Sequence, residues 1–380
     1  MVVATTSSTC VTTPWWWILL AGEALALVIV TPRLWRAARG GRQLRELTPT
    51  SAGSAPSTWN TPQDAFITVI IPARNEATRI AECLTPLRHA HGVLEVLVVD
   101  DESVDDTAKI AQQLGARVVV GAPLPEGWVG KIWALQQGVE AARGDVVVTL
   151  DADARPSVDL PIAAAQALMA SDAVLATVAP NFRTSSQPGQ WLHAAMLTSL
   201  VYRHGAGAGR ASRDAVANGQ CMVFRRVDAI NGKWCHQVRN AIIEDVALVR
   251  WLVKQGRQVQ MFDGTSLLTV HMFAGFVDTW RGWGRSLSLS GVDRVSRQIS
   301  DALVTLLTLA APIWLLLAGG ATPLTALLLV IRLGTLVGAR RAYERPGVGY
   351  WLSPVADLLA WVVVAWGILS PSREWRGRKY

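Results

Sequence analysis

The sequence predicts an α/β domain, built on a doubly wound and mostly parallel sheet, with transmembrane helices on its N- and C-terminal sides. Two observations lead to this fold class. Short apolar runs alternate with segments of helical spacing through residues 66–180, which is the pattern of parallel βαβ units. Long apolar stretches lie near both ends, and hydrophobic residues make up 51% of the 380 residues against 17% that are charged.

The central region is expected to alternate between strands and helices. The expected strands are Phe66–Ile71, Val93–Val99, Arg117–Val120, Asp145–Leu150 and Asp172–Pro180. The expected helices are Ala77–His89, Asp105–Leu114, Lys131–Ala142 and, further along the chain, Glu244–Gln255. The last helix is expected to end at Gly256, because glycine readily adopts the left-handed conformation that terminates helices.

The N-terminal apolar stretch, Trp15–Val30, has the composition of a membrane helix with tryptophans at its interfaces. It does not resemble a cleaved signal peptide, because the charges follow it and no small-residue cleavage site is present. The arginines that follow it place the N-terminus outside and residue 33 onward in the cytoplasm, by the positive-inside rule. These arginines are Arg33, Arg36, Arg39, Arg42 and Arg45.

Three C-terminal segments are each about as long as one membrane crossing. They are Ala302–Gly319, Ala321–Gly338 and Trp351–Leu369. Three full crossings would put the basic tail at residues 373–379 outside, against the charge rule, so one segment is expected to be re-entrant or interfacial; which one is left open. The charges inside membrane segments are expected to pair between helices. These charges are Glu23, Arg332 and Asp357.

The expected division of the chain has four parts. They are a membrane anchor with a basic flank at residues 1–39, a linker rich in Gly, Ser, Thr and Pro at 40–65, a cytosolic domain at 66–290, and C-terminal membrane helices with a basic tail at 291–380. The net charge of +7 comes mostly from juxtamembrane arginines, which suit an anionic membrane surface. Nucleic acid is not an expected partner, because the central region has no basic patch interleaved with aromatic residues. The four cysteines have no metal-type spacing and are expected to be free thiols.

Two carboxylates, Asp151 and Asp153, follow the expected strand Asp145–Leu150 directly. Ligands bind at the carboxyl edge of the sheet in open α/β folds. Two carboxylates one residue apart can hold a hard divalent cation, which in turn neutralises a diphosphate. The pair is therefore a candidate metal site.

Polar residues also follow the first two expected strands, as Pro72–Glu76 and Asp100–Ser103. Because these strand ends meet at the same sheet edge, their side chains can line one crevice with Asp151. An ionised carboxylate there can accept hydrogen bonds from a base or a ribose. For Ser103 and Asp105, capping of the following helix is an equally good interpretation.

Lys131 follows the glycine-containing stretch Gly127–Gly130 at the start of an expected helix, where a phosphate could bind. The alternative is an ordinary surface lysine, and the stretch does not match a P-loop. Glu244 and Asp245 open another helix. The helix dipole accounts for most such acids, and the functional alternative is that one of them is a general base.

Taken in order, these motifs resemble the family 2 glycosyltransferases over about residues 66–290. The motifs are Pro72–Glu76, Asp100–Ser103, Gly130–Leu135, Asp151–Asp153, Asn218–Gln220 and Glu244–Asp245. The stretches Gly127–Lys131 and Gly282–Arg285, with the C-terminal membrane helices, resemble the branch that glycosylates membrane lipids. That branch includes carotenoid, hopanoid-associated and ceramide-type glucosyltransferases.

The resemblance implies a glycosyltransferase A-type fold and an inverting transfer of a hexose from a UDP- or GDP-sugar, with Mg²⁺ or Mn²⁺ as cofactor. It implies that Ala73, Arg74 and Glu76 contact the nucleoside and that Asp100 or Asp101 binds the base. Asp153, helped by Asp151, would hold the metal, and Asp245 would be the general base. The remaining donor contacts would come from Lys131, Gln220, Glu244, Trp283 and Arg285.

The processive signature Gln-x-x-Arg-Trp is absent, which indicates one sugar per acceptor. The expected acceptor is a hydroxyl or carboxyl of a carotenoid, hopanoid or other membrane lipid. Trp280 and Trp283 would form either an acceptor platform or an interfacial belt. The expected location is the cytoplasmic membrane, with the catalytic domain facing the cytoplasm. The alternatives are a polyprenyl-phosphate sugar synthase and a non-catalytic protein that binds nucleotide sugars, and no oligomeric state is predicted.

Overall fold

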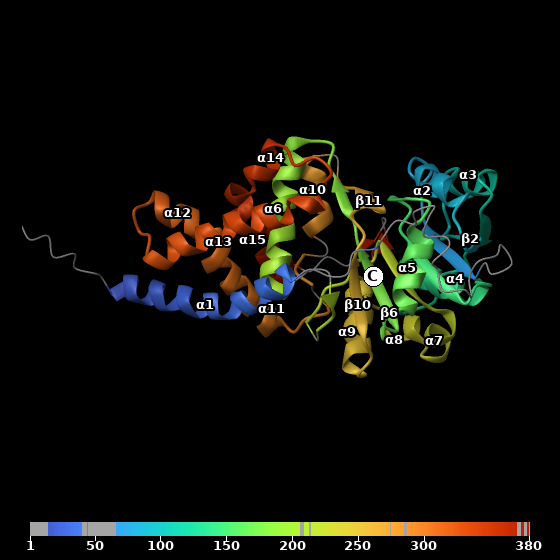
Figure 1. Ribbon diagram of the computed structural model, residues 1–380, viewed down its shortest axis with the longest axis horizontal. Coiled ribbons are helices and arrows are strands. Elements are labelled where there is room, and N and C mark those ends of the chain that lie inside the picture. The colour runs from blue at the N-terminus through green and yellow to red at the C-terminus, as the bar shows by residue number, and fades with distance from the viewer. Residues whose placement is uncertain are drawn as a thin grey trace, which may run out of the picture.

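The computed structural model places a sheet domain beside a group of long helices (Figure 1). It describes residues 14–39, 44, 66–205, 209–212, 214–273, 275–284, 287–289, 291–370, 374–375 and 378–379. Apart from Leu44, the expected linker lies outside the described residues, and so do residues 373, 376 and 377 of the basic tail. The boundaries expected for the four parts of the chain therefore stay predictions.

The first half of the main sheet is parallel. Within the eight-stranded order β3-β2-β1-β4-β9-β6-β10-β8, the first four strands pair in parallel. Their bounds are β1 Ile67–Ala73, β2 Val93–Asp100, β3 Arg117–Val120 and β4 Val146–Leu150. Every residue of β1 and β4 is buried, as expected for central strands covered on both faces. This half of the sheet confirms the predicted βαβ alternation.

The second half of the sheet is mixed. Strand β9 runs antiparallel between β4 and β6, β10 is parallel to β6, and β8 is antiparallel at the edge. Their bounds are β6 Leu175–Ala179, β8 Gly209–Arg210, β9 Cys221–Arg225 and β10 Val259–Asp263. A second sheet has the order β5-β11-β7. Its strands are β5 Ala154–Pro156, β7 Asn181–Arg183 and β11 Leu268–His271.

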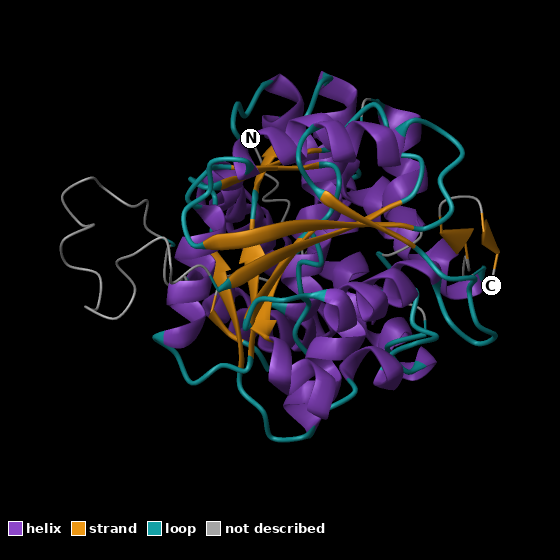
Figure 2. Cartoon of the chain, turned by 90° about the vertical axis from the view of Figure 1, so that its right-hand side faces the viewer, coloured by secondary structure: helices purple, strands orange, loops and turns teal. Residues whose placement is uncertain are grey.

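Helices cover both faces of the main sheet (Figure 2). Alternate residues of β1 point to opposite faces, so Val69 and Ile71 belong to one apolar cluster and Ile70 to the other. The first cluster includes residues of α2, α3 and α5, and the second includes residues of α4, α7, α8 and α9. The bounds are α2 Ile80–Leu87, α3 Thr107–Gln113, α4 Gly130–Ala141, α5 Leu160–Met169, α7 Arg226–Asn231, α8 Trp234–Gln237 and α9 Glu244–Lys254.

The helical part is organised around α6, Gln187–His204, which contacts α1, α10, α11, α14 and α15. The bounds of the other helices are α1 Pro14–Ala38, α10 Phe276–Gly284, α11 Val295–Thr305, α12 Pro312–Leu317, α13 Pro323–Ala339, α14 Val348–Trp351 and α15 Asp357–Leu369. Near the C-terminus, β12 (Glu374–Trp375) pairs with β13 (Arg378–Lys379).

Two described helices, Pro14–Ala38 and Pro323–Ala342, are long and apolar enough to cross a membrane. Both expose large apolar side chains, among them Ile18 at 73% and Val330 at 64%. The crossing expected at Ala302–Gly319 is not one regular α-helix, because a π-helical turn at Leu306–Ala310 separates α11 from α12. The number of crossings stays a prediction.

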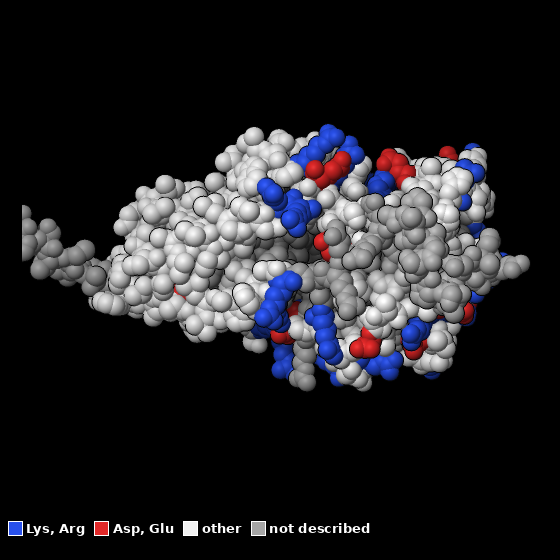
Figure 3. All heavy atoms as spheres, viewed as in Figure 1, with Lys and Arg blue, Asp and Glu red and all other residues white. Residues whose placement is uncertain are grey.

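The charges within the expected membrane segments have partners. Arg332 Nε lies 2.7 Å from Asp357 Oδ2, and both residues are almost fully buried. Glu23 is fully buried on α1 and accepts hydrogen bonds from the hydroxyls of Thr322 and Thr325 at the start of α13. On the surface drawn in Figure 3, lysines and arginines gather where the helices meet the sheet domain. The far end of the helical part is almost uncharged on this face.

Helix α4, which begins beside the expected ligand-binding edge, packs on the sheet through Gly138. A Cβ at this position would lie 2.6 Å from Ile70 Cγ2 and 3.2 Å from Val99 Cγ2. We therefore expect Gly138→Ala to destabilise the protein by about 1–3 kcal/mol, as overpacking does, and to lower the Tm. The matched control is Gly334→Ala in α13, where no atom lies within 4 Å and alanine improves helix propensity. Equal Tm values for Gly138→Ala and the wild type would contradict this packing.

Candidate active site

The polar edge lies where β4 ends and the antiparallel β9 begins. The backbone N–H of Asp151, directly after β4, donates to the carbonyl of Gln220 over 3.1 Å. Gln220 directly precedes β9, so the segment Asn218–Gln220 lies against the end of β4. The structure therefore brings two of the motifs to the same edge, and Gln220 contributes a backbone contact there.

Lys131 joins three elements at this edge. Its Nζ lies 2.9 Å from Asp151 Oδ1 and 2.8 Å from Glu244 Oε1. Lys131 is in the first turn of α4 and Glu244 in the first turn of α9. Burial lowers the pKa of Lys131, but the charges of Asp151 and Glu244 outweigh this effect and hold it well above its usual value. Lys131 is therefore a permanent cation between two carboxylates.

Asp245 lies beside this group, and its pKa is raised. Burial, together with the neighbouring charge of Glu244, raises the pKa of Asp245 to about 7. The charge of Lys131 and hydrogen bonds from the backbone N–H groups of Val246 and Gly219 oppose the shift. An acid whose pKa lies near neutral pH is suited to general base catalysis.

Gly219 is a site residue that the sequence analysis did not single out. A Cβ at this position would lie 2.9 Å from Asp245 Oδ2, so only glycine leaves room for the carboxylate. The only signal in the sequence is that Gly219 lies inside the motif Asn218–Gln220.

Another missed residue is Thr107, whose hydroxyl accepts the backbone N–H of Glu76 over 2.9 Å.

The loops after β1 and β2 hold each other in place. Arg74 Nη1 donates to the carbonyl of Asp101 over 2.7 Å and lies 3.7 Å from carboxylate oxygens of Asp101 and Glu102. The N–H of Asp101 donates to the carbonyl of Ala73 over 2.9 Å. Asn75 and Glu102 both have φ of 54°, a left-handed conformation that strains residues other than glycine. The predicted residues Ala73, Arg74 and Asp101 therefore form one rigid unit.

Asp100 and Glu76 are buried beside this unit. Asp100 is 7% exposed, and its Oδ1 has no hydrogen-bond partner among the described residues. A buried carboxylate oxygen without a donor is unfavourable, so Asp100 has unused capacity to accept a hydrogen bond from a ligand. Glu76 is 5% exposed and lies 3.9 Å from Arg79.

The alternative interpretation of Ser103 and Asp105, that they cap the following helix, agrees with the structure in part. Ser103 Oγ accepts the backbone N–H of Asn75 over 3.0 Å. Asp105 accepts backbone N–H groups from both Ala77 and Thr107, each over 3.1 Å, and Thr107 is the first residue of α3. Asp105 therefore satisfies the start of the helix and also ties the β1 loop to the β2 loop.

Asp151 and Asp153 suit a divalent cation that is shared with a ligand. Both carboxylates are partly accessible, and the described residues contain no group of three or more His, Cys, Asp or Glu that could hold a metal by themselves. Mg²⁺ and similar hard ions are commonly held by one or two carboxylates and complete their shell with phosphate oxygens and water. The ammonium of Lys131 at 2.9 Å from Asp151 indicates that this position attracts a cation. The residues present therefore fit such an ion.

One predicted residue, Trp283, is not part of this group. Trp283 in α10 packs against His193 of α6, with ring centroids 5.4 Å apart, among residues of α6 and α15. This position favours the interpretation of Trp283 as a helix-packing residue. Arg285 lies outside the described residues.

Comparisons with known proteins agree with the geometry. Residues 68–231 match the model of glycosyl transferase family 2. A 4,4'-diaponeurosporenoate glycosyltransferase of Staphylococcus haemolyticus is 27% identical over 230 residues, which cover 59% of this chain and 61% of that protein. A protein of the same name from Staphylococcus aureus is 40% identical over 88 residues, or 23% of this chain and 24% of that one. The matches thus span about three fifths or less of these relatives.

Among solved structures, a mannosyltransferase of Pyrobaculum calidifontis, determined with GDP-Man and Mn²⁺, resembles the chain with a TM-score of 0.52 at 18% identity. The match covers 93% of this chain and 99% of that one, and it bears on the fold alone. The predicted fold class, an A-type glycosyltransferase fold, is confirmed. Residues 68–231 are thus similar to a glycosyl transferase family 2 domain.

Proposed function

We propose that this protein transfers a single hexose from a nucleotide sugar to a membrane lipid, with inversion at the anomeric carbon. One observation carries the proposal: Asp245, with its pKa raised to about 7, lies beside the charged group of Lys131, Asp151 and Glu244. A base and a cationic diphosphate site at one sheet edge suit displacement of a nucleoside diphosphate by an activated oxygen.

On the donor side, Asp151 and Asp153 would hold Mg²⁺ or Mn²⁺. When bound, this ion would neutralise the diphosphate and stabilise it as a leaving group. The neighbouring structure was solved with GDP-Man and Mn²⁺, which supports a donor of this class, either a UDP- or a GDP-hexose. Asp100 Oδ1 would accept a hydrogen bond from the base or ribose, and Arg74 would keep this loop in place. Lys131 would donate to a phosphate oxygen once the donor is bound.

On the acceptor side, Asp245 would remove the proton from the attacking oxygen. The new bond forms between this oxygen and the anomeric carbon while the bond from that carbon to the diphosphate oxygen breaks. Because the base and the leaving group lie on opposite sides of the carbon in such a displacement, the configuration inverts. The proton ends on Asp245 and the electron pair of the broken bond on the diphosphate.

The helical part supports a lipid as acceptor. Helices α1 and α13 expose large apolar side chains, and lysines and arginines gather where the helices meet the sheet domain (Figure 3). This arrangement suits an integral protein of the cytoplasmic membrane, with the domain on the cytoplasmic side near anionic headgroups. The relatives' name denotes a carotenoid carboxylate as acceptor. A carboxylate is already ionised at neutral pH, whereas a hydroxyl needs a base, so Asp245 favours a lipid hydroxyl.

We expect Asp245→Asn to lower kcat for a lipid hydroxyl by about 10²–10⁴-fold, the usual contribution of a general base, while nucleotide affinity is largely retained. The measurement is transfer from a panel of UDP- and GDP-hexoses to extracted membrane lipids. Asp228→Asn, a half-buried acid on α7, is the matched control. Undiminished transfer by Asp245→Asn would exclude the base assignment and favour an acceptor that is already anionic, such as a carboxylate or a polyprenyl phosphate.

The pKa of Asp245 also predicts the pH dependence. The base must be ionised, and its pKa in the folded protein is raised to about 7, so kcat/KM should fall about tenfold for each pH unit below 7. Raising the pKa also makes ionisation of Asp245 unfavourable to folding, so Asp245→Asn should raise the Tm at pH 8 more than at pH 5. Rates measured from pH 5 to 9 test the first expectation. A rate that stays level down to pH 5 would contradict it.

Lys131 should compete with the metal when no donor is bound. We expect Lys131→Met to bind free Mn²⁺ more tightly, because Asp151 loses its present cation, and to bind UDP about tenfold more weakly in the presence of Mn²⁺. Titration calorimetry with Mn²⁺ alone and then with UDP measures both affinities. The exposed Lys109→Met is the control. Unchanged Mn²⁺ affinity in Lys131→Met would show that Asp151 is not a metal ligand.

A further inference from the structure

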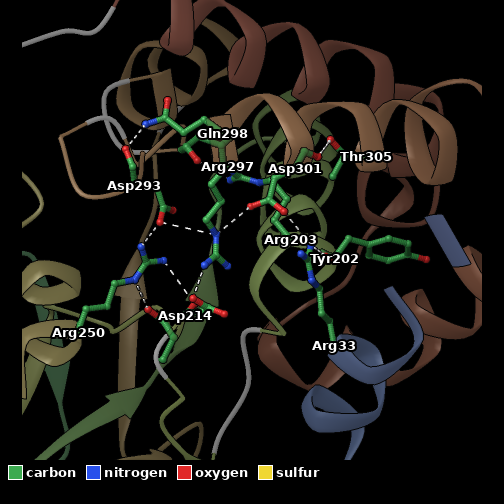
Figure 4. Close-up of polar contacts among 12 residues, drawn as sticks. Arg33, Tyr202, Arg203, Asp214, Arg250, Asp293, Arg297, Gln298, Asp301 and Thr305 are labelled. Carbon is green, nitrogen blue, oxygen red and sulfur yellow. Dashed lines mark hydrogen bonds and ion pairs between the residues drawn. The ribbon is translucent and has the colours of Figure 1, made fainter. Parts of the chain in front are cut away.

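A cluster of ionised side chains, several of them buried, lies where the sheet domain meets the long helices (Figure 4). We call it the junction network. Its members are Arg33 on α1, Arg203 on α6, Arg250 on α9, Arg297 and Asp301 on α11, and the loop residues Asp214 and Asp293. Arg203 and Asp301 are each 2% exposed and Arg250 is 5% exposed, so these charges are largely removed from water.

Arg250 is the member on the sheet domain's own helix, and it has three partners. Its Nη1 donates to Asp293 Oδ1, its Nε to the carbonyl of Ala215 over 3.0 Å, and its Nη2 to the carbonyl of Asp214 over 3.3 Å. The planar guanidinium makes these bonds in fixed directions, which a lysine cannot reproduce. Arg250 therefore fixes α9 to two segments at once.

The network continues from these partners to the long helices. Arg297 donates to Asp214 and lies 3.6 Å from Asp301 Oδ2, both through its guanidinium. Asp301 in turn accepts from Arg33 of α1 over 2.9 Å. Figure 4 shows this continuous path of ion pairs from α1 through α11 to α9.

Arg250 is connected to Asp245 in two ways, through α9 itself and through the segment Asp214–Ala215. Asp245 and Arg250 lie on the same helix, and the first turn of α9 has no side-chain cap to fix it. The segment Asp214–Ala215 leads to Gly219, which packs directly against the Asp245 carboxylate, since a Cβ at Gly219 would lie 2.9 Å from Asp245 Oδ2. One guanidinium thus restrains the helix that carries Asp245 and the segment that packs against its carboxylate.

We infer that Arg250 is a positioning residue for Asp245, and that the junction network couples this position to the packing of α1 and α11. The inference rests on the proposed function for the role of Asp245. A buried ion pair by itself adds little to stability, because desolvation offsets the attraction, so a positional role accounts better than stability for a network of this size. Misplacing a catalytic group by a small distance is enough to slow a reaction.

The test uses Arg250→Lys in the full-length protein, in detergent or nanodiscs. We expect kcat for lipid glycosylation to fall at least tenfold, while the KM for the donor and the Kd for UDP change less than twofold. Amide hydrogen exchange of residues 214–220 and 244–254 should become faster. The matched control is Arg332→Lys, which weakens the equally buried Arg332–Asp357 pair on α13 and α15. It should lower the Tm comparably without changing exchange in these two segments.

Wild-type exchange rates and an unchanged kcat in Arg250→Lys would overturn the inference, and so would an equal loss of kcat in Arg332→Lys. If Arg250→Lys does not fold, Arg33→Gln tests the far end of the network and should also speed exchange of residues 214–220. The exchange readout does not depend on activity. An inactive wild type would therefore refute the proposed function while the exchange rates still decide whether Arg250 restrains these segments.

Discussion

The mutual repulsion of carboxylates is the constraint on which the candidate site depends. Asp151 and Glu244 converge on one point from β4 and α9, and Asp245 lies next to Glu244. Like charges in a poorly hydrated place cannot all remain ionised without a cation. Lys131 supplies that cation, and burial of Asp245, together with the remaining repulsion from Glu244, raises the pKa of Asp245 to about 7. The arrangement that balances these charges therefore also gives Asp245 a pKa near neutral pH.

The mixed sheet is what brings these groups together. Four parallel strands deliver the ends of β1, β2 and β4 to one edge. Strand β9 runs in the opposite direction beside β4, so the segment before β9, rather than the one after it, lies at that edge. This reversal places Gly219 and Gln220 against Asp151 and Asp245. A wholly parallel sheet would have sent this segment to the other end of the domain.

Much of this could be predicted from the sequence, and the exceptions have physical reasons. Strands β1 and β4 are buried along their whole length, so they are continuous apolar runs that end visibly at polar motifs. The five residues of β9 do not determine in which direction the strand runs in the sheet. The contact between Lys131 and Glu244 could not be predicted either. Both depend on contacts between segments that are distant in the sequence. The π-helical turn at Leu306–Ala310 was missed because hydropathy reports apolarity and not backbone regularity. Arg250 and Asp293 were overlooked because isolated charges in a mixed region are typical of a surface, and only packing shows that they are buried.

Buried charge therefore has two different uses in this protein. In the helical part, Arg332 and Asp357 neutralise each other, and Arg332 also donates to the hydroxyl of Ser353, so this pair is neutralised within α13, α15 and the turn between them. At the junction, Arg250 and Arg297 share aspartates with several elements, so no pair can move alone. Apolar packing could join the same elements, but it is not directional and tolerates sliding. Guanidinium–carboxylate bonds fix orientation, which is the property that a proton-accepting residue on a neighbouring helix requires.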